Sequence, residues 1–165
     1  MNTDLIKDLR EKTGAGIMAC KSALESTNGD IEQAMKILQE QGIASARKKI
    51  GRNAQEGIIS SYIHANNKIG VLLELNCETD FVANTDDFKN LAHNITMQIA
   101  AMNPIYIDMD SNPKKIDDEN PNKDNSLLSQ PFIKDNEKSI KDLIEETSGK
   151  LGEKIEVKRF QRFSI

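Results

Sequence analysis

The sequence predicts an α+β protein in which a three-helix module precedes a small α/β core domain with a three-stranded antiparallel sheet packed on helices. Three observations support this prediction. Apolar residues recur at helical spacing over residues 5–42, they alternate at every second position over residues 57–77, and helical spacing returns over residues 84–103 and 139–151. Strands and helices in separate stretches are typical of α+β folds.

Composition limits the classes of function. The chain has 165 residues, of which 38% are hydrophobic and 29% are charged, so a core can form on a soluble protein. The net charge is −4, aromatic residues make up 4% and Trp is absent, so we expect no nucleic-acid partner. No stretch has the length of a membrane span and no leader is evident, so we expect a cytoplasmic protein or a processed organellar form.

The residue types that carry catalysis or hold metals are scattered along the chain. Cys20, Cys77, His64 and His93 stand alone, with no second ligand at metal-site spacing, and no glycine-rich phosphate loop is present. We therefore expect no enzyme, no cofactor and no metal site. Each cysteine is predicted to serve as a small apolar core residue.

Residues 1–43 are predicted to form the three-helix module. The turn 13–16, with two glycines, separates the first helix from the second, and Asn28-Gly29 ends the second. A module of this size lies near the lower limit for independent folding. The residues expected to face inward on these two helices are Leu5, Ile6, Leu9, Ile17, Cys20, Ala23 and Leu24.

The third helix has a start signal and a stop signal. Asp30 is expected to cap it, with Gln33 three residues later as in a capping box. Gly42 is expected to end it in the left-handed conformation. Its predicted buried stripe consists of Ile31, Ala34, Met35 and Leu38.

A basic linker helix is predicted over residues 44–56. It carries Arg47, Lys48, Lys49 and Arg52. Such a run indicates either a solvated linker or a contact with RNA or an acidic protein. The absence of neighbouring aromatic residues favours the solvated linker.

The core domain is predicted to span residues 57–165. Residues 57–64 and 69–77 form a predicted hairpin across the turn 65–68. A terminal strand is expected near residues 154–163, where the apolar alternation slips between Val157 and Phe160 and so indicates a bulge.

Two amphipathic helices are predicted to cover this sheet. The first is capped by Asn84 or Thr85 and ends at Pro104, and the second begins near Ser139. Residues 104–107 are expected to form a short edge strand or an extended segment, and the polar stretch 108–126 a mobile loop. The residues expected to face inward on the two helices are Phe88, Leu91, Ala92, Ile95, Ile99, Ile140, Leu143, Ile144, Thr147 and Leu151.

The tetrapeptide Thr79-Asp80-Phe81-Val82 lies between the strand 69–77 and the helix that follows it. A junction of this length turns at the surface, because its backbone groups need water or capping partners. Phe81 fits neither the strand period nor the helix stripe. The pattern leaves two interpretations open: Phe81 inserts into a pocket of a partner protein, or it folds back as a lid on its own core.

Four motifs in order along the chain resemble those of the translation elongation factor Ts family. They are TGAGIMACKSAL at 13–24, NGDI at 28–31, NCETDFV at 76–82 and QPFIKD at 130–135. The resemblance covers residues 1–103 and returns at 130–135 and in the terminal strand. It implies that the N-terminal module is similar to ubiquitin-associated (UBA) domains, and that the rest is one α/β subdomain of the family core.

The resemblance also implies a function without catalytic groups. Members bind elongation factor Tu and accelerate its release of GDP. By matching positions, Thr79-Asp80-Phe81-Val82 is expected to act as a wedge, with Asp80 and Phe81 inserted between helices of the GTPase domain near the magnesium site. The residues expected to form a second contact, through the N-terminal module, are Lys7, Arg10, Ile17 and Met18.

The chain departs from longer family members, which carry a second core subdomain and a helical hairpin. A single core subdomain predicts that a second molecule supplies the missing surface. We therefore expect a homodimer and a two-to-two complex with elongation factor Tu, for which the terminal strand offers one edge. The alternative function is a UBA-like adaptor that binds other partners through residues 14–42.

Overall fold

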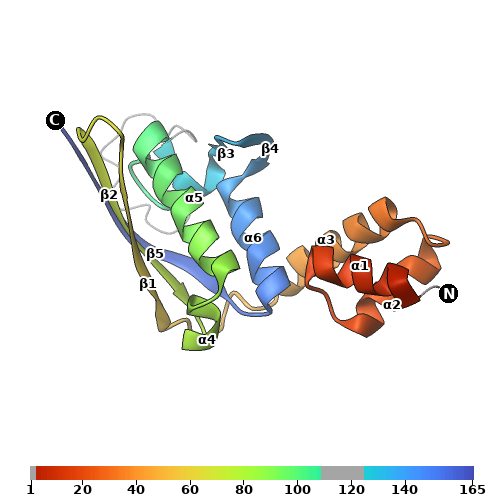
Figure 1. The fold of residues 1–165 in the computed structure, drawn as a ribbon. Helices are drawn as coiled ribbons and strands as arrows, with labels where there is room; N and C mark the ends of the chain where they lie inside the picture. The colour runs from red at the N-terminus through yellow and green to blue at the C-terminus, as the bar shows by residue number, and fades with distance from the viewer. Residues whose placement is uncertain (1–2, 109–124) are drawn as a thin grey trace.

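A computed structural model of the chain describes residues 3–108 and 125–165 (Figure 1). The interior of the predicted loop at 108–126 lies outside the described residues. The helices and strands are α1 (Thr3–Thr13), α2 (Ile17–Ser26), α3 (Ile31–Arg47), β1 (Glu56–Ile63), β2 (Ile69–Cys77), α4 (Asp80–Ala83), α5 (Asp86–Met102), η2 (Leu127–Ser129), β3 (Pro131–Phe132), β4 (Asp135–Ser139), α6 (Ile140–Leu151) and β5 (Ile155–Ser164).

The predicted three-stranded antiparallel sheet is confirmed. Its strand order is β1-β2-β5, so the terminal strand pairs with the hairpin predicted from residues 57–77. Glu74 pairs with Arg159, but its neighbour Leu75 pairs with Val157, so Lys158 is an extra residue. This is the bulge that the slipped alternation predicts. A second, two-stranded sheet, formed by β3 and β4, was not predicted.

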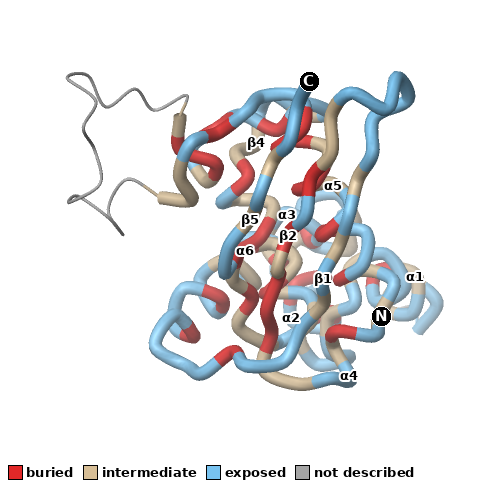
Figure 2. Tube along the Cα trace, turned by 90° about the vertical axis from the view of Figure 1, so that its left-hand side faces the viewer, coloured by how far each residue is buried: buried red, intermediate tan, exposed pale blue. Residues whose placement is uncertain are grey.

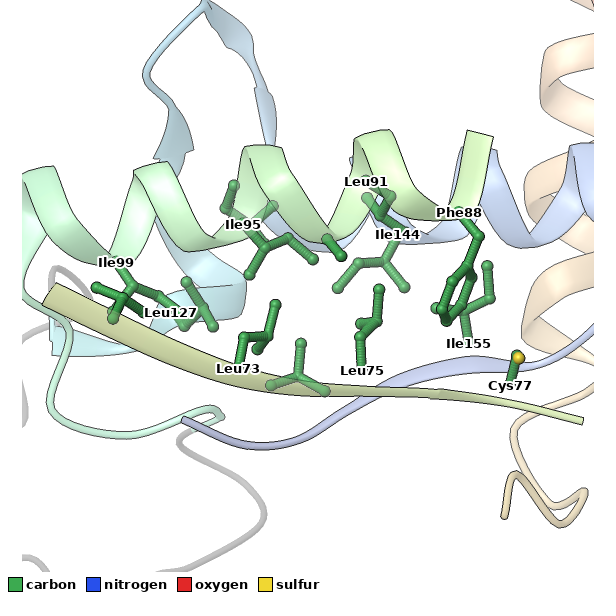
Figure 3. Packing of buried hydrophobic residues seen from close by; sticks show 14 of the residues in the cluster. Leu73, Leu75, Cys77, Phe88, Leu91, Ile95, Ile99, Leu127, Ile144 and Ile155 are labelled. Atoms are coloured by element: carbon green, nitrogen blue, oxygen red, sulfur yellow. The ribbon is translucent and has the colours of Figure 1, made fainter. Parts of the chain in front are cut away.

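The main core lies between this sheet and α5 and α6, which cover one of its faces (Figures 1 and 3). Leu73 and Leu75 of β2 meet Phe88 and Ile95 of α5, and all four side chains are essentially buried. Each such side chain contributes roughly 1.5–3 kcal/mol through its removal from water. Buried residues concentrate along the middle strand β2, whereas most of β1 and the end of β5 are exposed (Figure 2).

Local capping signals predict the helix starts correctly. Asp30 accepts a hydrogen bond from the backbone N–H of Gln33, at 3.0 Å, at the start of α3. Thr85, one of the two candidates, caps α5. Ser139 begins α6 with a full capping box, in which its partner is the carboxylate of Asp142. The Ser139 hydroxyl and N–H lower the pKa of that carboxyl.

The segment after α5 packs on a distant part of the chain. Of the predicted edge strand at residues 104–107, the structure shows an isolated parallel bridge between Tyr106 and Ser126, with bends at Ile105 and Ile107 on either side. The carbonyls of Tyr106 and Ile107 accept hydrogen bonds from the N–H groups of Leu127 and Leu128, at 2.9 and 3.0 Å. The buried Gln98 of α5 holds residues 130–133 in place. Its side chain forms hydrogen bonds with the Gln130 side chain, the Pro131 carbonyl and the Ile133 N–H.

The three-helix module has its own small core, but two predicted inward residues lie outside it. Ile17 is 54% exposed and Met35 is 37% exposed, so both predictions are wrong. Ile17 is in the first turn of α2, where side chains tilt toward the helix start and so point past the bundle. Ile37 takes the inward position expected for Met35. The buried residues of this core are Leu9, Cys20, Ala23, Leu24, Ala34 and Leu38.

The predicted end of α3 at Gly42 is also wrong. The helix continues to Arg47, so only residues 44–47 of the predicted linker helix over 44–56 are helical, and they form the last turn of α3. Residues 48–55 form turns and irregular chain, and Glu56 begins β1. Gly42 lies where α3 crosses α6, and a Cβ on Gly149 would come within 2.6 Å of the Gly42 carbonyl carbon and oxygen. The glycine pair therefore permits a close helix crossing. The domain boundary at residue 43 stays a prediction.

This crossing predicts opposite outcomes for two glycine-to-alanine changes within helices. Gly149→Ala should lower the free energy of unfolding by about 1–3 kcal/mol, because its Cβ would overlap the Gly42 backbone. Gly42→Ala places its Cβ at an ordinary 3.5 Å and should be neutral or stabilising by up to about 1 kcal/mol. Urea unfolding measures both, with Gly51→Ala as a control in open space. Equal effects at the two positions would contradict the close crossing.

Candidate functional site

The predicted junction between β2 and α5 is a single helical turn, α4, preceded by Thr79 as its N-cap (Figure 1). The Thr79 side-chain oxygen accepts a hydrogen bond from the N–H of Val82 at 3.4 Å. The Thr79 carbonyl accepts from the N–H of Ala83 at 3.2 Å. The tetrapeptide is therefore an ordered turn that presents its side chains in a fixed arrangement.

The four residues of the tetrapeptide divide into two exposed and two anchoring residues. Phe81 is 82% exposed and Asp80 is exposed beside it. Val82 is half-buried against the main core, and Thr79 is half-buried beneath the turn. Phe81 is therefore not the lid that one interpretation predicted, because it does not touch the core of its own domain. An exposed aromatic side chain on an ordered turn has the geometry of an anchor for a partner protein.

A carboxylate from the other end of the chain holds this turn. Glu153 accepts hydrogen bonds from the backbone N–H groups of Glu78 and Thr79, at 3.1 and 3.0 Å, and from the Thr79 hydroxyl at 2.6 Å. Glu153 was not among the residues predicted from the sequence. Its nearest local signal is Gly152, whose left-handed φ of 78° ends α6 and directs the next residue toward the turn.

A second acidic residue connects the turn to the segment after α3. The Glu78 carboxylate accepts from the Lys154 backbone N–H at 2.7 Å and from the Arg52 guanidinium at 3.3 Å. The Lys154 hydrogen bond, followed by that of Arg52, lowers the pKa of the Glu78 carboxyl. The Lys154 ammonium in turn donates to the Arg52 carbonyl at 3.0 Å. Three distant segments therefore meet at the base of α4.

Basic residues of the predicted linker form hydrogen bonds and ion pairs with other residues of the same chain. Arg47 pairs with Glu145 of α6 at 3.0 Å, and Arg52 pairs with Glu78. Lys49 is buried, and its ammonium donates to the Ser45 hydroxyl at 2.9 Å. Burial, and then the charge of Arg52, lower the pKa of Lys49. The solvated-linker interpretation is therefore wrong for Lys49, whereas Lys48 is exposed.

Both cysteines are buried, as predicted, and Cys77 contacts the turn that carries Phe81. Its thiol donates to the Thr79 carbonyl at 3.1 Å. Burial is the main reason that the pKa of this thiol rises from an ordinary 9.0 to about 11, and the charge of Glu153 adds to the effect. The thiol is therefore protonated at neutral pH and acts as a structural group.

The second predicted contact group lies on the N-terminal module, beyond α6 from the sheet (Figure 1). Lys7 and Arg10 are exposed on α1. Ile17 and Met18 begin α2 and are 54% and 74% exposed. The structure does not bring these four residues together with α4. The exposed apolar side chain of Phe81 and those of Ile17 and Met18 therefore lie on two separate surfaces.

Within residues 3–108 and 125–165, every helix is too short or too polar to span a bilayer. The same ranges also contain no group of three or more His, Cys, Asp or Glu residues placed to hold a metal ion.

The fold defines a class of α+β protein in which a three-helix module is joined to a small core domain with an exposed aromatic side chain on an ordered turn, and comparisons identify the family. A family profile described as Elongation factor TS matches residues 7–123. Elongation factor Ts of Thermoanaerobacter sp. (strain X514) is 46% identical, over 99% of this chain and 94% of the relative. Those of Coprothermobacter proteolyticus and Thermotoga maritima are 44% and 46% identical, over the whole of this chain and 98% and 96% of the relatives. The chain belongs to the elongation factor Ts family.

The environment of Cys77 predicts how its reactivity depends on pH. Alkylation of Cys77 by iodoacetamide should be far slower than that of a Cys introduced at exposed position 22 (Ser22→Cys), and should rise only as the pH approaches about 11. Since folding favours the protonated thiol, its contribution to stability is present below about pH 9 and is lost as the pH rises toward 11. Mass spectrometry after timed alkylation measures both rates. Equal rates at pH 8 would contradict the buried, protonated thiol.

Proposed function

We propose that this chain is a guanine-nucleotide exchange factor that binds elongation factor Tu in the cytoplasm and promotes GDP release during translation elongation. It acts without catalysing a chemical reaction. Membership of the elongation factor Ts family supports this proposal. The observation that carries it is Phe81, which is 82% exposed on a turn held by Thr79 and Glu153.

Asp80 and Phe81 form the wedge that enters the GTPase domain near its magnesium site. Nearly all of the Phe81 side chain is free to be buried on binding, which supplies roughly 1.5–3 kcal/mol. This free energy is gained only in the state in which the GTPase domain has opened a pocket. By linkage, the factor lowers nucleotide affinity as much as the nucleotide lowers factor affinity.

The target of the wedge is sensitive to small displacements. A P-loop GTPase holds GDP through backbone amides, a lysine and Mg²⁺, whose octahedral shell tolerates little distortion. The Asp80 carboxylate is exposed next to Phe81, where it can accept a hydrogen bond or repel the acidic groups around the metal. Either effect favours the open state.

A wedge alone is too weak for a large effect, so a second contact contributes. A ten-thousandfold change in nucleotide affinity needs about 5.5 kcal/mol of differential binding, more than one phenylalanine supplies. We assign the remainder to the wider interface, including Lys7, Arg10, Ile17 and Met18. The exposure of Ile17 and Met18 supports this assignment, because their apolar side chains gain hydrophobic free energy when a partner covers them.

The same exposed side chains favour one alternative function. A UBA-like module, residues 1–43, could bind other proteins through Ile17 and Met18 as an adaptor. In that case the core domain would be a structural support. Substitution of Phe81 would then leave partner binding unchanged, which separates the two proposals.

We also propose a homodimer, and hence a two-to-two complex, formed through the outer face of the sheet. This face lies opposite α5 and α6 and carries the exposed Ile59, Ile63, Leu72 and Phe163. The register places them close together, because Ile63 and Phe163 both pair with Gly70 of the middle strand. A self-complementary apolar face suits a twofold contact with a second copy of the chain.

The wedge predicts a loss of exchange without a loss of stability. Phe81→Ala should slow the GDP release that the factor stimulates by about ten- to a hundredfold, since it removes the Phe burial at the partner. Its unfolding temperature should match that of the native protein, because Phe81 contacts no core. Stopped-flow release of fluorescent GDP measures the first effect. Ile105→Ala, equally a loss of an exposed apolar side chain, should exchange normally. Full activity of folded Phe81→Ala would refute the wedge.

The dimer proposal predicts a change of mass. Leu72→Lys places a charge in the centre of the outer sheet face and should convert the dimer to a monomer at micromolar concentration. Ile105→Lys adds the same charge at an exposed position that belongs to no strand of the sheet, and it should remain a dimer. Size-exclusion chromatography with light scattering distinguishes the two masses. A monomeric native protein, or a dimeric Leu72→Lys variant, would contradict the proposed interface.

A further inference from the structure

We infer that Glu153 is a positioning residue for exchange: its carboxylate fixes the orientation in which α4 presents Asp80 and Phe81. This inference rests on the proposed function. Both carboxylate oxygens take part, since Oε2 accepts from the N–H groups of Glu78 and Thr79, and Oε1 accepts from the Thr79 hydroxyl. Hydrogen bonds to a charged acceptor are about twice as strong as those between neutral groups.

The turn needs such a support because it is too short to hold itself. α4 has four residues, and an isolated helical turn is unstable because its first hydrogen bond must fix several backbone angles. The Thr79 hydroxyl donates to Glu153 and accepts from the Val82 N–H, so the carboxylate selects the side-chain position in which Thr79 caps the turn. Without Glu153 the cap loses that orientation, and the N–H groups of Glu78 and Thr79 lose their acceptor.

Glu153 is itself held in place by α6. Gly152 closes the helix with its N–H on the Ser148 carbonyl at 2.9 Å, and the buried Ser148 hydroxyl donates to the Glu153 carbonyl. One turn earlier, Gly149 makes the close crossing with Gly42 of α3. The carboxylate therefore connects the wedge to the helix against which the N-terminal module packs. It fixes the two proposed contact surfaces relative to each other.

The test uses Glu153→Gln in the full chain. Glutamine keeps the shape but replaces one acceptor oxygen with a donor NH₂ group, so it cannot satisfy all three donors. Stimulated GDP release should fall about tenfold, the effect of losing one charge-assisted hydrogen bond. Glu137→Gln removes the same charge from an exposed position of β4 and should exchange normally. Normal exchange by Glu153→Gln would overturn the inference.

A double-mutant cycle separates positioning from a general structural role. The affinity for nucleotide-free elongation factor Tu is measured for the native chain, Glu153→Gln, Phe81→Ala and the double variant. If Glu153 acts through Phe81, Glu153→Gln weakens binding of the native chain about tenfold and that of Phe81→Ala little. Equal weakening in both backgrounds would overturn the positioning role.

Hydrogen exchange of the free protein gives a readout that does not depend on elongation factor Tu. In Glu153→Gln the amides of Glu78 and Thr79 should exchange at least about tenfold faster, while amides of β2 keep their protection. Unchanged exchange at both amides would overturn the inference. If the native chain does not stimulate GDP release, the proposed function fails, and this measurement still decides whether Glu153 holds the turn.

Discussion

The close crossing of α3 and α6 at Gly42 and Gly149 is the contact on which the placement of both candidate surfaces depends. It lets two helix backbones approach where any side chain on Gly149 would collide. Through α3 it fixes the three-helix module, and through the end of α6 it fixes Glu153 and the turn above it. Two binding surfaces held at a set spacing can engage one partner with less loss of conformational entropy than two surfaces that move independently.

In the turn 79–82, the residues that order the backbone are different from the residue that is exposed to a partner. Thr79 and Val82 face inward and make the hydrogen bonds and core contacts that order α4, so Phe81 can stay exposed without disorder. Because Phe81 is not buried in the folded chain, its hydrophobic free energy does not stabilise the fold and is gained only when a partner covers it. Hydrogen bonds at the base of the turn also help to order it, since the Arg52 guanidinium and the Lys154 N–H donate to the Glu78 carboxylate.

Features encoded by neighbouring residues could be predicted, and features that depend on distant residues could not. The caps at Asp30 and Ser139 have their partners within three residues, and the bulge near Lys158 follows from a slipped alternation. Glu153 acts on a residue 74 positions away, so no local pattern indicates it. At Gly42 the sequence predicted only a helix end, because the glycine's role in a close helix crossing depends on the distant Gly149 of α6. For Phe81 the sequence left wedge and lid open, and its exposure excludes the lid.

The central claim is that Phe81 enters the GTPase domain of elongation factor Tu beside its magnesium site. A photoreactive benzoylphenylalanine at position 81 tests it directly, because irradiation joins the side chain to whatever lies against it in the complex. Mass spectrometry of the products should locate the cross-link on GTPase-domain helices next to the nucleotide, and excess GDP should suppress it by linkage. A cross-link to another domain, or none in a complex that still forms, would contradict the account.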